Sequence, residues 1–124
     1  MRVLICDDDT VTLRILEFQF RKDGFEVFKA VTGKEAQKIL AENNDIDLLL
    51  TDLYMPSMHG LELLTYIRKT LCSNIPIVVV SREKVEENVL NAFELGANDY
   101  LTKPFDLADL SNRVKNLIKN DKND

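Results

Sequence analysis

The sequence predicts an α/β protein in which five parallel strands form one doubly wound sheet and each strand is followed by a helix. Short runs made entirely of apolar residues, such as Leu48–Leu50 and Ile77–Val80, are typical of strands buried on both faces. These runs alternate along the chain with stretches in which apolar residues recur at helical spacing. The connections are short, and strands joined through helices pair in parallel with right-handed crossovers.

The first two strand–helix units are predicted from the N-terminal third of the chain. The apolar run Val3–Cys6 predicts a strand, and Thr10–Asp23 predicts a helix that ends at Gly24, a typical residue after a helix C-terminus. The residues expected on the inner face of this helix are Val11, Ile15, Leu16 and Phe18. Phe25–Ala30 is rich in aromatic and β-branched residues, which favours a strand. Thr32 then begins a second helix, whose expected inner stripe is Ala36, Ile39 and Leu40.

Three more units complete the pattern. Leu48–Thr51 predicts a buried strand, Ile77–Val80 a β-branched strand that follows Pro76, and Tyr100–Leu101 a short last strand. A helix is expected after each of these strands, and Gly96 ends the fourth helix of the chain. The helical stripes are Leu61, Leu64, Ile67, Arg68 and Leu71; Val85, Val89, Ala92 and Phe93; and Leu107, Leu110, Val114, Leu117 and Ile118. Five such units predict a flavodoxin-like (βα)5 fold with strand order 2-1-3-4-5.

Length and composition restrict the class of protein. The 124 residues fit one domain, expected over residues 1–120, followed by a polar tail at 121–124. The formal charge of −5 argues against direct nucleic-acid binding, which needs a basic surface. The sequence contains no apolar stretch long enough for a secretory signal or a membrane span. Cys6 and Cys72 lie among apolar residues without CxxC spacing, which predicts two buried thiols and a cytoplasmic location.

Polar side chains follow the carboxyl ends of four predicted strands. They are Asp7 and Asp8, Asp52, Ser81 and Lys103. In this strand order the first and third strands flank the crevice where ligands bind, so the acids are expected to face each other. Clustered carboxylates repel each other unless a cation holds them, and oxygen ligands favour a hard ion such as Mg²⁺. Lys103 and Ser81 suit the oxygens of a phosphoryl group, and Asp52 can then act as a nucleophile that forms an aspartyl phosphate.

In this order and spacing, the features resemble the receiver domain of two-component response regulators, from Arg2 to about Asn120. The matching fragments are Asp7–Asp8, Asp52 with Met55–Pro56 and Gly60, Ser81, Gly96–Leu101 and Lys103–Phe105. The resemblance implies that Asp52 accepts a phosphoryl group from a sensor histidine kinase or a phosphotransfer protein. It also implies that Asp8, Asp52 and the backbone carbonyl of Tyr54 bind Mg²⁺, which Mn²⁺ can replace, with Asp7 assisting through water.

The resemblance further implies a conformational switch. Ser81 and Lys103 would contact the phosphoryl group, with a cis peptide bond expected before Pro104. Ser81 and Tyr100 would rearrange on phosphorylation and alter the surface of the fourth helix, fifth strand and fifth helix. That surface would control a protein target and could support a phosphorylation-dependent dimer. The chain would not be an enzyme that acts on other molecules, because it assists only its own phosphorylation and dephosphorylation.

Three positions depart from the pattern of the family. Ser81 stands where threonine is more common, Arg82 where a small residue is usual, and His59 where an aspartate commonly precedes the glycine. Arg82 either crowds the site or adds positive charge to it. Aspartate is a good helix cap and histidine is not, so we expect the start of the third helix to be adjusted. No ligand role is expected for His59, which has no second histidine or cysteine at metal-binding spacing.

Two other functions fit parts of the sequence. Asp7–Val11 matches the DxDxV motif of haloacid-dehalogenase-like phosphatases, in which Asp7 would be the nucleophile and Asp9 the general acid. This match covers five residues and leaves the region around Asp52 unexplained. In the receiver, Asp9 is expected only to stabilise the start of the first helix. The chain can also be a receiver-like scaffold that binds a partner without phosphorylation, although such a scaffold has no need for the full set of acids and lysine.

Overall fold

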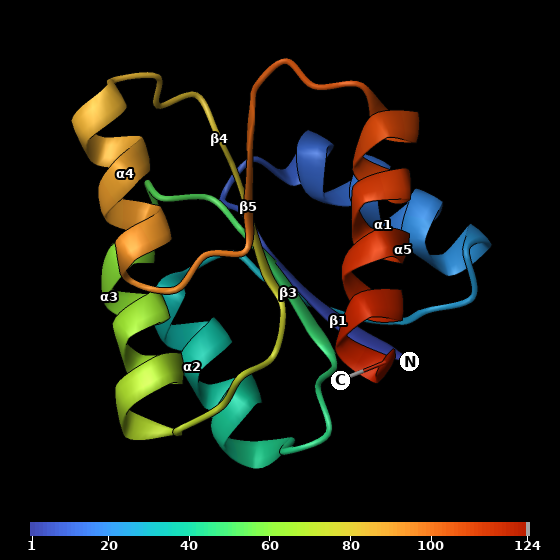
Figure 1. Ribbon diagram of the computed structural model, residues 1–124, viewed down its shortest axis with the longest axis horizontal. Helices are drawn as coiled ribbons and strands as arrows, with labels where there is room; N and C mark the ends of the chain where they lie inside the picture. The colour runs from blue at the N-terminus through green and yellow to red at the C-terminus, as the bar shows by residue number, and fades with distance from the viewer. Residues whose placement is uncertain (124) are drawn as a thin grey trace.

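The computed structural model describes residues 1–123 and contains one sheet covered by helices on both faces (Figure 1). Its strands are β1 (Arg2–Cys6), β2 (Glu26–Ala30), β3 (Leu48–Thr51), β4 (Ile77–Ser81) and β5 (Asp99–Thr102). Its helices are α1 (Thr10–Lys22), α2 (Gly33–Glu42), α3 (Gly60–Thr65), α4 (Glu86–Glu94) and α5 (Leu107–Asn123), and the π-helical segment η1 (Tyr66–Thr70) continues α3. The strands pair in parallel in the order β2-β1-β3-β4-β5, which confirms the predicted fold.

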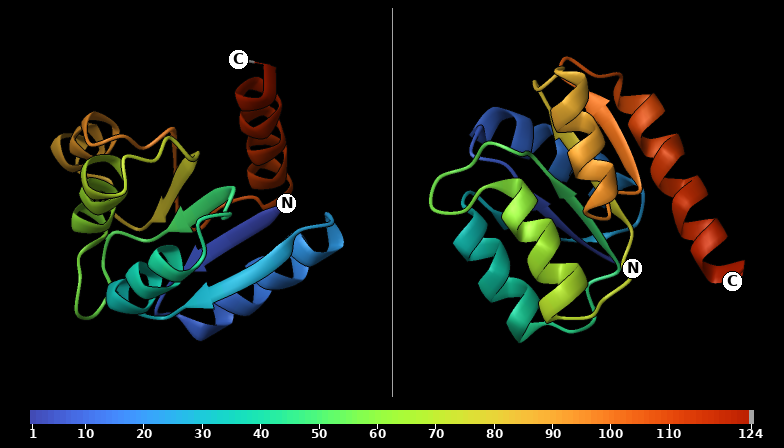
Figure 2. Two further views of the ribbon diagram at one scale, coloured as in Figure 1. Left: turned by 90° about the horizontal axis from the view of Figure 1, so that it is seen from below. Right: turned by 60° about the vertical axis from the view of Figure 1, so that its left-hand side comes forward.

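The helices form two layers around the sheet. Helices α2, α3 and α4 cover one face, and α1 and α5 cover the other (Figures 1 and 2). Strand β1 shows how the sheet serves both layers: Leu4 and Cys6 pack in the cluster with α2–α4, whereas Val3 and Ile5 pack in the cluster with α1 and α5. Both faces of the central strands are therefore buried, which explains their continuous apolar runs.

The inner face of α1 differs from the prediction. Val11, Ile15 and Phe18 are exposed, and Phe18 leaves 71% of its surface accessible. Leu16 is buried as expected, but its neighbours on the inner face are Leu13 and Phe20. The helix carries apolar residues on two faces, and both sets have helical spacing. Periodicity alone could not decide which of the two faces the sheet.

Helix α4 and the end of η1 are also more exposed than predicted. Ala92 is buried, but Val85 and Phe93 are 58% and 42% exposed because α4 begins after Val85 and packs through the small side chain of Ala92. Cys72 is exposed rather than buried, because it adopts a left-handed conformation (φ 51°) where the chain leaves the helix. Cys6 is buried as predicted, and burial raises the pKa of its thiol to about 12.

The register of the central strands places the polar residues that follow them. Cys6 pairs with Thr51, so Asp7 and Asp52 leave the sheet side by side. Ser81 pairs with Thr102, which brings the residue after β5, Lys103, to the same edge. The carboxyl ends of β1, β3, β4 and β5 therefore converge, as expected for a ligand site in a parallel sheet.

None of the described helices has the length and apolar character required to span a membrane. Helix α5 continues to Asn123, beyond the domain boundary expected at residue 120. The predicted tail at 121–124 thus overlaps the end of this helix, and residue 124 lies outside the described residues. The boundary itself stays a prediction.

Candidate functional site

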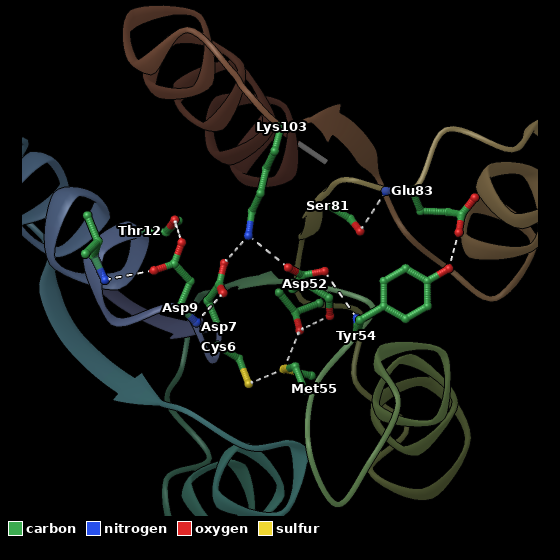
Figure 3. A network of polar contacts seen from close by, with 12 residues as sticks. Cys6, Asp7, Asp9, Thr12, Asp52, Tyr54, Met55, Ser81, Glu83 and Lys103 are labelled. Atoms are coloured by element: carbon green, nitrogen blue, oxygen red, sulfur yellow. Dashed lines mark hydrogen bonds and ion pairs between the residues drawn. The ribbon is translucent and has the colours of Figure 1, made fainter.

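Lys103 connects two carboxylates from neighbouring strands. Its Nζ donates hydrogen bonds to Asp7 Oδ2 at 2.7 Å and to Asp52 Oδ2 at 2.8 Å (Figure 3). The remaining carboxylate oxygens accept from backbone amides: Asp7 Oδ1 from the N–H of Asp9 at 2.9 Å, and Asp52 Oδ1 from that of Tyr54 at 3.2 Å. Both acids are buried. The site therefore holds Asp52 in one orientation beside a positive charge.

Burial and charge act against each other in this cluster. Burial raises the pKa of Asp7, and the charge of Asp52 adds to this effect, although the hydrogen bond from Lys103 opposes it. Burial alone would lower the pKa of Lys103, but hydrogen bonds and charges from Asp52 and Asp7 outweigh it, and the pKa is raised. Lys103 is therefore a firmly protonated ammonium group that serves two carboxylates.

A cavity of about 410 Å³ opens onto these groups. It is lined by Asp8, Asp9, Asp52, Tyr54, Arg82 and Lys103. In the described part of the chain, no three or more acidic, histidine or cysteine side chains are arranged as a ready metal cluster. Mg²⁺ does not need one, because it usually binds one or two carboxylates and completes its shell with water. The hard oxygens of Asp8 and Asp52, which line the same cavity, fit such an ion.

Asp9 has a different role from Asp8. Its carboxylate caps α1 by accepting from the N–H of Val11 at 3.1 Å and from the hydroxyl of Thr12 at 2.8 Å. This confirms the expectation that Asp9 stabilises the start of the helix. Both of its oxygens are engaged there, which counts against Asp9 as the general acid of a phosphatase.

Ser81 and Tyr100 meet at the backbone of Glu83. The Oγ of the buried Ser81 accepts from the N–H of Glu83 at 3.2 Å, and the Tyr100 hydroxyl donates to the carbonyl oxygen of Glu83 at 2.8 Å. The carboxylate of Glu83 accepts from the hydroxyl of Tyr54 and, at 2.8 Å, from the N–H of Val85. Glu83, which no sequence pattern singles out, thus connects both predicted switch residues to the loop after Asp52. Figure 3 shows its contacts with Ser81 and Tyr54.

The sequence matches the family model described as the response regulator receiver domain over residues 3–115. The chain belongs to this family. It is a receiver domain of the response regulators of two-component systems. The cis bond between Lys103 and Pro104 agrees with the expectation drawn from the family.

Relatives of this receiver include longer regulatory proteins. It is 40% identical over 118 residues to the transcriptional regulatory protein PrrA of Mycobacterium tuberculosis, covering 95% of this chain and 50% of the relative. It is 35% identical over 117 residues to the transcriptional regulatory protein SrrA of Staphylococcus aureus, covering 94% and 47%. The chain therefore spans about half the length of these curated relatives.

Solved structures of other receiver domains share the fold. A CheY-like receiver domain protein from Methanospirillum hungatei superimposes with a TM-score of 0.91 at 30% identity, covering 98% of this chain and 96% of that chain. The non-phosphorylated HemR receiver domain from Leptospira biflexa gives a TM-score of 0.85 at 30% identity, covering 94% and 93%. The doubly wound architecture predicted from the strand pattern is thus that of known receivers.

The start of α3 in this receiver corrects one expectation. His59 does cap the helix: its Nδ1 accepts from the N–H of Leu61 at 3.1 Å. The ring also packs edge-on against Tyr54, with centroids 5.3 Å apart. The imidazole nitrogen takes the place of a carboxylate oxygen as acceptor, so α3 begins at Gly60 with a side-chain cap. The roles assigned to Asp7, Asp8, Asp52, Ser81, Lys103, Tyr100 and Tyr54 stay predictions.

Proposed function

We propose that Asp52 is the phosphoacceptor of this receiver. The observation that carries the proposal is the 2.8 Å contact between Asp52 Oδ2 and Lys103 Nζ at the edge of an open cavity. A carboxylate oxygen of Asp52 attacks the phosphorus atom of a phosphohistidine on a sensor kinase or phosphotransfer protein. The new P–O bond forms as the P–N bond breaks, and the imidazole nitrogen keeps the electron pair and takes up a proton. Lys103 offsets charge on the phosphoryl oxygens.

The acids of the cavity support a divalent ion during this step. Asp8, Asp52 and the Tyr54 carbonyl would hold Mg²⁺ or Mn²⁺, with Asp7 assisting through water. A bound ion would supply positive charge toward the phosphoryl oxygens. Asp7 positions Lys103 through their 2.7 Å hydrogen bond, and Asp52 supplies the attacking oxygen. Because Asp7 is buried and bonded to Lys103 and to Asp9, we assign it the supporting role.

We assign the output to the surface formed by α4, β5 and α5. On phosphorylation, the Ser81 hydroxyl would turn toward the phosphoryl group and leave the N–H of Glu83. The Tyr100 hydroxyl bonds the same residue, so a change in the backbone of Glu83 would reach Tyr100. This is a local hydrogen-bond change that biases a two-state loop. The altered surface would then control a protein target in the cytoplasm or form a dimer.

The experiment is mass spectrometry of the protein after incubation with acetyl phosphate, with and without Mg²⁺. We expect the mass of one phosphoryl group, added only with Mg²⁺ and removed by hydroxylamine. Asp52→Asn should abolish the adduct, whereas Asp7→Asn should retain Asp52 as the labelled residue. An adduct on Asp7 would instead support the phosphatase-like function. Absence of any adduct, with a partner still bound equally by Asp52→Ala, would support the unphosphorylated scaffold.

A further inference from the structure

Arg82 lies on the wall between two cavities. One is the 410 Å³ cavity that contains Asp52. The other, of about 540 Å³, lies between α1 and the connection from β5 to α5. Arg82 and Lys103 line both, and Lys84 adds a third cation to the larger cavity, which has no acidic residue in its lining. Arg82 therefore borders both the cavity that contains Asp52 and a neighbouring cavity lined by cations.

The charge of Arg82 is not neutralised by its surroundings. Within the described part of the chain, its guanidinium makes no ion pair within 4.0 Å, although Asp8 and Asp9 line the same cavity. The adjacent acid, Glu83, directs its carboxylate to the Tyr54 hydroxyl and the N–H of Val85. Lys103, in contrast, already serves two carboxylates. Arg82 is thus the exposed cation of this site whose donors are free for an incoming anion.

The backbone around Arg82 is fixed although its side chain is exposed. Ser81, on its N-terminal side, is buried and pairs with Thr102 in the sheet. Glu83, on its C-terminal side, is tied back by its N–H to Ser81 Oγ at 3.2 Å and by its carbonyl to Tyr100. The guanidinium therefore extends from a defined point at the mouth of the cavity, and its planar fork suits phosphate oxygens.

We propose that Arg82 promotes the capture of anionic phosphodonors, by binding anionic oxygens of the donor before transfer to Asp52. The inference rests on the proposed phosphoacceptor role of Asp52. It assigns Arg82 to donor recognition and leaves the phosphoryl transfer itself to Asp52 and Lys103. Donors with a dianionic phosphoryl group are favoured, and the effect is electrostatic, so it weakens as salt concentration rises.

The test compares the rate of Asp52 labelling by acetyl phosphate at low donor concentration in wild type, Arg82→Ala and Arg82→Lys. Arg14→Ala is the matched control, because Arg14 is exposed and lines neither cavity. We expect labelling of Arg82→Ala to be about fivefold slower at low salt, since an exposed ionic contact is modest in strength. Arg82→Lys should stay within about twofold of wild type, and the defect should shrink at high salt. Decay of the adduct after donor removal should be unchanged.

The results distinguish donor binding by Arg82 from steric obstruction of the site by its side chain. Equal labelling of wild type and Arg82→Ala would overturn the inference and leave the phosphoacceptor function intact. Faster labelling of Arg82→Ala would do the same, because it would show that the side chain obstructs the site. A change confined to adduct decay would place Arg82 after the transfer and would also overturn it. Failure of wild type to label at Asp52 would overturn the proposed function and this inference together.

Discussion

Lys103 places one ammonium group between two buried acids, which makes it a structural residue as well as a site residue. We expect Lys103→Met to destabilise the protein by about 2 kcal/mol at neutral pH, because two carboxylates lose their shared cation in a site only partly open to water. Urea denaturation at pH 7 measures this. An unchanged urea midpoint would show that water replaces the ammonium group without loss of stability.

The destabilisation caused by Lys103→Met should change with pH in a defined direction. The pKa of Lys103 is raised above its ordinary value of 10.5 in the folded protein, so its contribution to stability is complete below that pH. It is lost as the pH rises through the raised value. We therefore expect the stability difference between wild type and Lys103→Met to narrow in alkaline solution. A difference that stays constant up to alkaline pH would contradict this assignment.

The effect of Asp7 on folding stability should depend on pH in the opposite direction. Because burial raises its pKa above the ordinary 3.8, the folded protein binds a proton there more tightly than the unfolded chain does. The ionised form therefore costs stability at neutral pH, and this cost disappears as the pH falls through the raised pKa. We expect Asp7→Asn to be more stable than wild type at pH 7 and to lose that advantage on acidification. Thermal denaturation across acidic and neutral pH tests it, and a less stable Asp7→Asn at pH 7 would contradict it.

At the residue scale, the sequence predicts the site residues that follow the strands but not the residues that connect them. Asp7, Asp52 and Lys103 could be predicted to meet, since parallel strands deliver their carboxyl ends to one edge. Glu83 could not, because its contacts with Ser81 and Tyr100 use backbone atoms and depend on a loop conformation that no pattern encodes. The cap at His59 was missed because general preferences for capping residues overlook one well-placed ring nitrogen.

Among the elements, α3 begins directly against the backbone of Asp52. A Cβ atom on Gly60 would lie 2.4 Å from the carbonyl oxygen of Asp52 and 2.7 Å from the Cα of Leu53. The N–H of Gly60 also donates to the carbonyl of Leu53 at 2.7 Å. Only a residue without a side chain allows this approach, so α3 and the backbone of Asp52 are packed directly against each other.

We expect Gly60→Ala to destabilise the protein by about 2 kcal/mol and to slow labelling of Asp52, because the backbone of α3 or Asp52 must move. Gly24→Ala is the comparison: nothing lies within 4 Å of its added Cβ, and its cost comes from a positive φ of 95° alone. It should destabilise the protein without affecting labelling. Normal labelling of Gly60→Ala would show that the loop absorbs the methyl group away from Asp52.

The strands were easier to predict from the sequence than the buried faces of the helices. The strands followed from their apolar runs, because burial on both faces leaves few alternatives. The faces of α1 did not follow, since Val11, Ile15 and Phe18 form a second apolar stripe that points outward. The change from α3 to η1 also has no sequence signal that periodicity could detect. Tertiary packing decides both features.

At the scale of the whole molecule, the proposed ion site would make folding stability depend on a divalent ion. An ion that binds the folded chain alone adds about 1.4 kcal/mol at tenfold excess over its dissociation constant. We expect Mg²⁺ to raise the melting temperature of wild type and to have a much smaller effect on Asp8→Asn. Asp106→Asn, which removes an acid outside the cavity lining, should respond like wild type. Equal responses of all three proteins would place the ion elsewhere.

Asp52 is one of several carboxylates at the same sheet edge, so the decisive measurement identifies the modified residue itself. After incubation with acetyl phosphate and Mg²⁺, borohydride reduces an aspartyl phosphate to homoserine, which peptide sequencing by mass spectrometry locates. We expect homoserine at position 52, absent without acetyl phosphate. Homoserine at position 7 or 8, with Asp52 unmodified, would contradict it.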